Sequence, residues 1–243
     1  MLGIVVKEKN GHLYLLRGVT VLLLLLQIFL ISKTHLTSGW EIQVWQSMAK
    51  QEVGKSEIEK KKIALTFDDG PHETYTPMLL KGLKERNVKA TFFLMGENAE
   101  KYPDIVKEMA VQGHVIGNHS YSHIQLNGVR EAQACTEITK TNEIIKELTG
   151  KSPEYIRPPF GAWSSNLDCI TSMIVVLWDI DPLDWKCQDT QLVVKRVVPK
   201  AEENAIILLH DSYKSSVEAA LQIIDELEKE GFEFVTVDDI LLD

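Results

Sequence analysis

Two adjacent carboxylates stand out as residues that could carry chemistry. Asp68 and Asp69 directly follow the apolar run IALTF, and a Gly-Pro pair follows them. Because Asp and Gly favour turns, a solvated turn is one interpretation of this segment. The other interpretation is that both carboxylates belong to a functional site, and the rest of the chain has to decide between the two.

Polar residues also follow four later apolar runs. They are His119 and His123 in HSYSH, Arg157 and Phe160 in RPPFG, Asp181, Asp184 and Trp185 in DPLDW, and His210 in LLHD. Each cluster alone has a structural explanation, since H-x-x-x-H is common by chance and His210 could be a buried core histidine. Together, the five clusters supply the nitrogen and oxygen ligands of a hydrolytic metal site and candidate acid–base groups.

The segments that carry these residues alternate between strand and helix patterns from Lys62 onward. Apolar, β-rich runs predict strands at 62–67, 90–95, 114–117, 155–157, 174–178, 205–209 and 234–237. Amphipathic patterns predict helices at 76–86, 99–112, 129–148, 165–171, 190–201 and 217–230. This alternation predicts an α/β fold with a parallel sheet, in which chemistry collects at the carboxyl ends of the strands. Periodicity alone leaves open a closed barrel and an open doubly wound sheet.

Composition narrows the class of protein. The 243 residues suffice for one domain with an appendage, and a hydrophobic content of 44% allows a large core. The net charge of -9 argues against nucleic-acid binding, because an acidic surface repels phosphates. The cysteines Cys135, Cys169 and Cys187 lack C-x-x-C spacing, which argues against a zinc ribbon. One disulfide, such as Cys169 to Cys187, and three unpaired core cysteines both fit the sequence.

The N-terminal segment predicts a membrane anchor. The uncharged run GVTVLLLLLQIFLIS at 18–32 follows Lys7, Lys9 and Arg17, which places the N-terminus in the cytoplasm. No A-x-A-like cleavage site follows it, so an uncleaved single-pass anchor is favoured, with a cleaved signal peptide and a secreted protein as the alternative. We therefore divide the chain into a cytoplasmic stub and anchor (1–32), a linker (33–61) and a domain outside the membrane (62–243).

The motifs TFDDGP, HSYSH, RPPFG, DPLDW and LLH resemble, in order and spacing, those of the polysaccharide deacetylases, carbohydrate esterase family four. The resemblance covers about residues 60–241. It implies a distorted seven-stranded parallel (β/α) barrel that removes N-acetyl, sometimes O-acetyl, groups from sugar polymers. It also implies a divalent metal, usually Zn²⁺, with Co²⁺ or another divalent ion as alternatives.

The resemblance assigns the metal site and the base. Asp69, His119 and His123 correspond to the metal ligands, two histidines and one carboxylate with an open position. Asp68 corresponds to the general base, which takes a proton from the attacking water. Arg157 corresponds to the arginine that orients Asp68 and favours its ionised form.

The resemblance also assigns the acid and the substrate contacts. His210 corresponds to the general acid that protonates the departing amine, and Asp181 to the carboxylate that orients this histidine and raises its pKa. The backbone N–H of Phe160 corresponds to the donor for the oxyanion, although Tyr is common at this position in the family. Trp185 and Leu208 correspond to the apolar wall around the acetyl methyl group.

These assignments predict a monomeric, membrane-tethered N-deacetylase that acts on cell-wall glycan. The favoured substrate is N-acetylglucosamine in peptidoglycan. Relatives that act on N-acetylmuramic acid often lack D-x-x-D-W, which is complete here. Chitooligosaccharides, N-acetylmuramic acid and acetylated xylan stay open as substrates. A non-catalytic glycan-binding protein and a membrane-anchored assembly factor are alternatives from other classes; the complete set of site residues argues against both.

Overall fold

The computed structural model describes residue 27 and residues 60–163, 169 and 173–242. The chain divides into two units, Met1–Glu59 and Lys60–Asp243, and the second is the described domain. No helix among the described residues is long and apolar enough to cross a membrane. The predicted anchor at 18–32 and the linker at 33–61 lie almost entirely outside the described residues, so both stay predictions.

Seven parallel strands form one sheet, and each predicted strand position holds one of them. They are β1 (Lys61–Asp68), β2 (Thr91–Leu94), β3 (Val115–Asn118), β4 (Tyr155–Ile156), β5 (Ile174–Val175), β6 (Ile206–His210) and β7 (Phe232–Val235). Their order is β5-β4-β3-β2-β1-β6, and β7 pairs with the first half of β1. After β5 the chain returns to the other edge of the sheet, where Ile180 forms a bridge with Ile207 of β6. The parallel α/β fold is confirmed, whereas no ladder joins β5 to β6 in the described chain to close a complete barrel.

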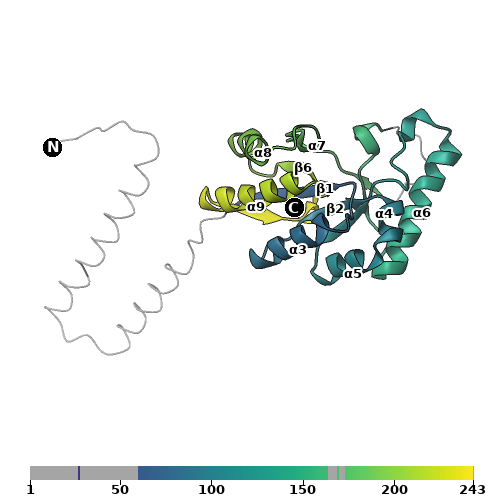
Figure 1. The fold of residues 1–243 in the computed structure, drawn as a ribbon, viewed down its shortest axis with the longest axis horizontal. Coiled ribbons are helices and arrows are strands. Elements are labelled where there is room, and N and C mark those ends of the chain that lie inside the picture. Colours follow the sequence, from purple (N-terminus) through teal and green to yellow (C-terminus); the bar gives the residue numbers. More distant parts are fainter. Residues whose placement is uncertain (1–26, 28–59, 164–168, 170–172, 243) are drawn as a thin grey trace, which may run out of the picture. The chain divides into compact units, whose positions relative to one another are not determined.

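Helices pack around the sheet (Figure 1). They are α3 (Tyr75–Glu85), α4 (Gly96–Lys101), α5 (Pro103–Val111), α6 (Glu131–Thr149), α7 (Asp184–Cys187), α8 (Thr190–Val197), α9 (Lys214–Lys229) and α10 (Val237–Leu241). Along β1, Ile63, Leu65 and Phe67 enter the main apolar core with α3 and α9. The alternate residues Thr66 and Asp68 are buried on the opposite side, since successive strand residues point to opposite faces. This alternation places the end of β1 where its carboxylate can face other strand ends.

Two helix predictions differ from the structure, and a third is not tested by it. The predicted helix 99–112 is two helices, because Pro103 lacks a backbone N–H and starts α5 at its first turn. The predicted helix 190–201 ends as α-helix at Val197 and continues as a 3₁₀ turn. The predicted helix 165–171 lies outside the described residues except for Cys169. The short helices α7 and α10 were too brief to leave a periodic signal.

One disulfide joins α6 to the segment after the fourth strand. Cys135 and Cys169 are bonded across a sequence separation of 34 residues, and Cys187 is free. The suggested Cys169–Cys187 pairing is therefore wrong. Pairing follows the distance between Cα atoms, and the fold brings Cys135 of α6 to 5.6 Å from Cys169.

Candidate active site

The carboxyl ends of the central strands bring the predicted residues together. Asp68 at the end of β1 is in register with His210 at the end of β6. On the other side of β1, β2 and β3 end at Leu94 and Asn118, and His119 follows directly. Because parallel strands end at the same edge of the sheet, residues of three other sequence clusters (His119, Arg157 and His210) lie next to Asp68 and Asp69.

Asp69, His119 and His123 form a group with the geometry of a metal site. One ligand atom from each lies within 4.8 Å of the other two. Nε2 of His119 is 3.4 Å, and Nε2 of His123 is 3.3 Å, from Oδ1 of Asp69. This Oδ1 is buried and accepts no hydrogen bond from the described residues. A buried carboxylate oxygen facing two imidazole nitrogens fits a divalent metal, which would satisfy all three ligand atoms.

Groups outside the ligand set orient two of the ligands. Nδ1 of His119 lies 2.6 Å from the backbone carbonyl of Arg157, so the ring donates there and keeps Nε2 for the metal side. The side-chain amide of Asn98 donates to the backbone carbonyl of Asp69 at 2.7 Å. Asp69 itself has a left-handed φ of 71°, which turns its side chain away from the direction of β1.

The charges of the ligand group act on one another. Burial would raise the pKa of Asp69, but His119, His210 and His123 bring it below its ordinary value. Burial would lower the pKa of His119, but Asp68 and Asp69 raise it, whereas burial lowers the pKa of His123. A metal ligand histidine is neutral, so metal binding at this site is coupled to proton release.

Arg157 is the fully buried partner of Asp68. Its Nη1 donates to Oδ1 of Asp68 at 2.8 Å and to the hydroxyl of Thr66 at 2.7 Å. Nε and Nη2 donate to the backbone carbonyls of Val176 and Leu177. The guanidinium has 0% exposure, and these four hydrogen bonds, one of them to a carboxylate, compensate its burial. This arrangement leaves Oδ2 of Asp68 facing the histidines, 3.7 Å from Nε2 of His119.

His210 pairs with Asp184, not with Asp181. Oδ1 of Asp184 is 2.8 Å from Nδ1 of His210, and Oδ2 accepts from the His210 backbone N–H at 2.8 Å. Asp181 instead accepts from the backbone N–H of Leu183 at 2.7 Å. The prediction that Asp181 orients His210 is wrong, because Asp181 belongs to the turn before α7 whereas Asp184 begins α7, which packs on β6. Burial would lower the pKa of His210, but Asp184 raises it to about 9.

The predicted substrate contacts surround this group. Phe160 has a left-handed φ of 61° and is 66% exposed, and its ring packs edge-on against His123 at 4.6 Å. Its backbone N–H donates to no protein acceptor within the described chain. Trp185 of α7 is 47% exposed, whereas Leu208 is buried in β6 on the same face as His210, two residues before it. Phe160 and Trp185 are therefore free to contact a ligand, and Leu208 lies deeper.

Sequence reasoning missed the supporting residues. Asp184 was visible in DPLDW, but the motif offers two carboxylates and its spacing does not say which one meets His210. Asn98, which fixes the backbone of Asp69, and Glu137, which binds the loop between the histidines, lie outside every motif. Polar side chains on helices are common at solvent-exposed positions, so their types alone carry no signal.

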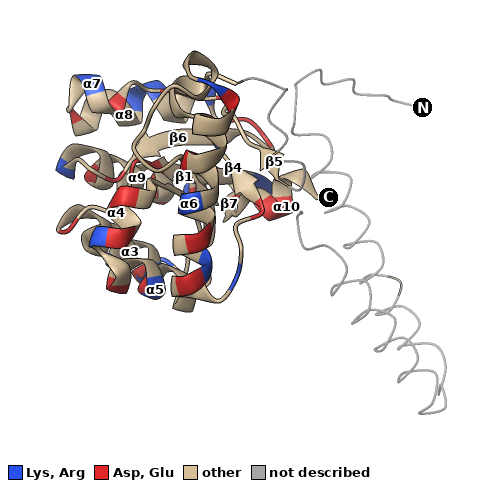
Figure 2. Cartoon of the chain, turned by 90° about the vertical axis from the view of Figure 1, so that its right-hand side faces the viewer, with Lys and Arg blue, Asp and Glu red and all other residues tan. Residues whose placement is uncertain are grey.

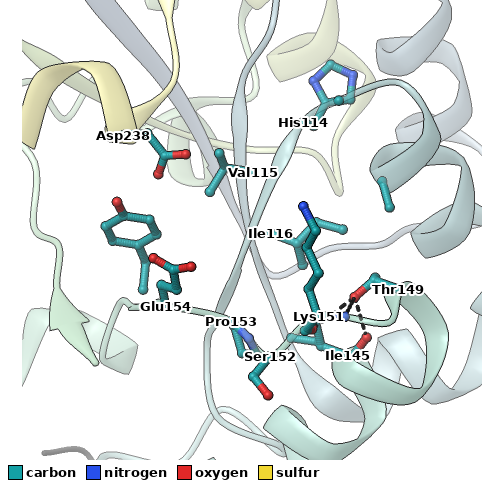
Figure 3. Close-up of a pocket in the computed structure, with 13 residues that line it drawn as sticks. His114, Val115, Ile116, Ile145, Thr149, Lys151, Ser152, Pro153, Glu154 and Asp238 are labelled. Atoms are coloured by element: carbon teal, nitrogen blue, oxygen red, sulfur yellow. Dashed lines mark hydrogen bonds between the residues drawn. The ribbon is translucent and has the colours of Figure 1, made fainter. Parts of the chain in front are cut away.

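A separate hollow lies at the opposite ends of the strands. It has a volume of about 360 Å³ and is lined by residues at the starts of β3 and β4, among them His114, Val115 and Glu154, and by Asp238 of α10 (Figure 3). None of the residues predicted for catalysis or metal binding lines it. The candidate active site is therefore the cluster at the carboxyl ends, and not this hollow.

Known proteins share these features. The model of the polysaccharide deacetylase family matches residues 55–173. The peptidoglycan-N-acetylglucosamine deacetylase of Bacillus cereus is 44% identical over 185 residues, which are 73% of this chain and 67% of that protein. The peptidoglycan-N-acetylmuramic acid deacetylase PdaC of Bacillus subtilis is 40% identical over 178 residues, which are 73% of this chain but 38% of that protein. The chain thus matches well under half of the length of the second relative.

Solved structures agree with the sequence matches. The structure of peptidoglycan deacetylase PdaC from Bacillus subtilis has a TM-score of 0.73 at 38% identity, covering 76% of this chain and 92% of that chain. A mutant of a CE4 family pseudoenzyme has a TM-score of 0.70 at 29% identity, covering 75% of this chain and 68% of that chain. The sequence motifs, the fold and these matches agree, and the chain belongs to the polysaccharide deacetylase family.

Proposed function

We propose that this protein is a metal-dependent deacetylase that hydrolyses N-acetyl groups of peptidoglycan, with N-acetylglucosamine as the preferred sugar. The observation that carries the proposal is that a complete set of metal ligands lies next to a candidate base and a candidate acid, each with its own partner. Asp69, His119 and His123 form the ligand group, and the Asp68–Arg157 and His210–Asp184 pairs lie beside it. Amide hydrolysis needs a base, an acid and stabilisation of the oxyanion, and each has a residue here.

The protein's own residues divide the work as follows. A divalent metal held by Asp69, His119 and His123 would polarise the acetyl carbonyl and lower the pKa of water. Asp68 takes a proton from the attacking water at Oδ2, since Arg157 occupies Oδ1. His210 donates a proton from Nε2 to the departing nitrogen, because Asp184 holds Nδ1. The backbone N–H of Phe160, which has no acceptor among the described residues, would donate to the developing oxyanion.

Zinc is the metal that the ligand set favours. Two imidazole nitrogens and one carboxylate with open positions are typical of catalytic zinc, and Co²⁺ accepts the same ligands. The two peptidoglycan deacetylases described above differ in sugar, one being named for N-acetylglucosamine and the other for N-acetylmuramic acid. The complete DPLDW motif, with exposed Trp185, supports N-acetylglucosamine, and chitooligosaccharides and acetylated xylan are the alternatives.

The location of the enzyme belongs to the same proposal. The apolar run at 18–32 with preceding basic residues supports a single-pass anchor with the catalytic domain outside the cell. Peptidoglycan is the N-acetylated polymer that such a domain would meet. Protease added to intact cells should degrade the domain, and a protected domain would contradict this location.

Acetate release tests the activity. The full chain is incubated with N-acetylglucosamine oligomers and with peptidoglycan, with Zn²⁺ and with a chelator. We expect acetate with Zn²⁺, none with the chelator, and a loss of about 10² to 10⁴-fold in Asp68→Asn, since that change removes the base. Asp104→Asn is the matched control, because Asp104 is 95% exposed on α5 and lies outside the site. Mass spectra of the products identify the sugar that loses its acetyl group.

A non-catalytic glycan-binding protein is the alternative that this experiment excludes. The similarity to a CE4 family pseudoenzyme makes the fold alone insufficient to assign activity. Binding of the oligomer without acetate, at saturating Zn²⁺ and over the pH range tested, would reject the enzyme in favour of this alternative.

A further inference from the structure

The loop between the two histidine ligands has a backbone that needs support. Ser120 and His123 have φ angles of 62° and 58°, in the left-handed region. Residues other than glycine disfavour this region by about 1 to 2 kcal/mol each. Contacts from the rest of the protein therefore have to hold the loop in this conformation.

Glu137 of α6 supplies three of these contacts. Its Oε2 accepts hydrogen bonds from the backbone N–H groups of Tyr121 at 3.0 Å and Ser122 at 2.7 Å. The hydroxyl of Ser122 lies 3.0 Å from both carboxylate oxygens. Hydrogen bonds to an ionised acceptor are about twice as strong as neutral ones. One carboxylate thus fixes the middle of the loop.

The helix that carries Glu137 is itself fixed beside β3. The side-chain amide of Asn118 donates to the backbone carbonyl of Ile138 at 2.9 Å and to Oδ1 of Asn142 at 2.7 Å. The disulfide anchors α6 at Cys135, two residues before Glu137. Acidic and basic residues are interspersed along α6 (Figure 2). The carboxylate of Glu137 is therefore presented from a rigid element.

The two histidine ligands depend on the loop to different degrees. His119 is 3% exposed and its Nδ1 is held by the carbonyl of Arg157. His123 is 27% exposed, and no described residue forms a hydrogen bond with its Nδ1. Apart from ring contacts with Phe160 and His119 and the approach of its Nε2 to Asp69, the position of His123 is set by the backbone that precedes it. That backbone is the segment bound by Glu137.

We infer that Glu137 is a positioning residue of the metal site, which holds the loop so that His123 presents Nε2 to the same ion as His119 and Asp69. The inference rests on the proposed function only in that the site binds a divalent metal. Residues around a metal that orient its ligands typically change affinity by 10 to 100-fold when they are replaced. Loss of Glu137 should therefore weaken metal binding while the rest of the ligand set stays in place.

Zinc affinity measured on the full chain tests this inference without reference to catalysis. A chromophoric chelator competes for Zn²⁺ with the parent protein and with Glu137→Ala, Glu137→Gln and Glu143→Ala. Glu143 is the matched control, because it is exposed on the same helix and forms no hydrogen bond or ion pair within the described residues. We expect Kd to rise about 10 to 100-fold in Glu137→Ala, less in Glu137→Gln, which keeps one acceptor, and less than about two-fold in Glu143→Ala.

The visible spectrum of the Co²⁺ complex gives a second measurement. The d–d bands of Co²⁺ report ligand number and geometry. Glu137→Ala should shift them toward those of His123→Ala, which a merely structural role would not do. Unchanged Zn²⁺ affinity and Co²⁺ spectrum would overturn the inference, even if Glu137→Ala lowered the Tm of the metal-free protein. If Glu137→Ala does not fold, Glu137→Gln decides on the same criteria. Tight Zn²⁺ binding without acetate release would reject the proposed function and leave this inference standing.

Discussion

Replacement of Asp184 by Asn removes the carboxylate that the structure places on His210 while keeping its shape. Asp184 is fully buried and binds both Nδ1 and the backbone N–H of His210 at 2.8 Å. An amide in its place would favour the wrong orientation or tautomer of the ring. The perturbation therefore acts on the proton that His210 is expected to donate, and not on the metal ligands.

The magnitude follows from the electrostatics of the pair. Burial opposes protonation of His210, but the hydrogen bond and charge of Asp184 raise its pKa from 6.5 to about 9. At about 1.4 kcal/mol per pKa unit, this rise favours the protonated ring by about 3 kcal/mol. Without the Asp184 carboxylate the burial remains and only the charges of Asp68 and Asp69 still raise the pKa of His210, so we expect this pKa to lie well below 9. The protonated ring also stabilises the fold below pH 6.5, and this contribution is lost as pH rises towards 9.

The assay is kcat/KM for acetate release as a function of pH, with Asp181→Asn as the matched control. The alkaline limb of the pH profile should move to lower pH in Asp184→Asn, and activity at neutral pH should fall about 10² to 10⁴-fold. Asp181→Asn should keep the limb of the parent protein, because Asp181 only caps the turn at Leu183. A shifted limb in Asp181→Asn with an unchanged one in Asp184→Asn would refute this reasoning.

Three further substitutions test other parts of the structure. Arg157→Lys should lower the free energy of unfolding by about 3 kcal/mol and reduce acetate release. The single nitrogen of a lysine cannot reach Asp68 and the carbonyls of Val176 and Leu177 at once, as the three guanidinium nitrogens do. Urea denaturation measures the change in stability, and an unchanged urea midpoint would contradict the prediction. Cys135→Ser should lower the free energy of unfolding by about 3 to 4 kcal/mol under oxidising conditions, because the disulfide closes a long loop, and should leave it unchanged in the presence of a reductant. An equal loss of stability under both conditions would argue against the disulfide. Gly70→Ala should reduce both acetate release and Tm, because the Cβ of the alanine would lie 2.5 Å from the carboxylate oxygens of buried Asp211. Acetate release and Tm equal to those of the parent protein would show that this close contact relaxes.

Local patterns were sufficient for the seven strands and for the residues at their ends. Short apolar runs marked the strands. The central strands β1, β2 and β6 are buried on both faces, and that requirement acts on consecutive residues. The polar residues that follow five of these runs fall at the carboxyl edge by the topology of parallel strands alone. Asp69, His119 and His123 could therefore be assigned to one site from the sequence, and the structure brings their ligand atoms within 4.8 Å of one another.

Where the sequence offers two residues of the same type for one role, only the tertiary structure shows which of them makes the contact. Asp181 and Asp184 are both carboxylates of one motif, and only the start of α7 against β6 determines that Asp184 meets His210. The partner of Cys169 likewise depends on a Cα distance that spacing does not encode.

Glu137 illustrates the same limit for a residue with no motif. It lies 14 positions after His123 in the sequence, yet its carboxylate binds the loop that carries this ligand. The sequence by itself determined which strand ends carry chemistry, because that information is local and periodic. The tertiary structure decided which side chains support the chemistry, because a contact between a helix and a loop depends on how distant elements pack.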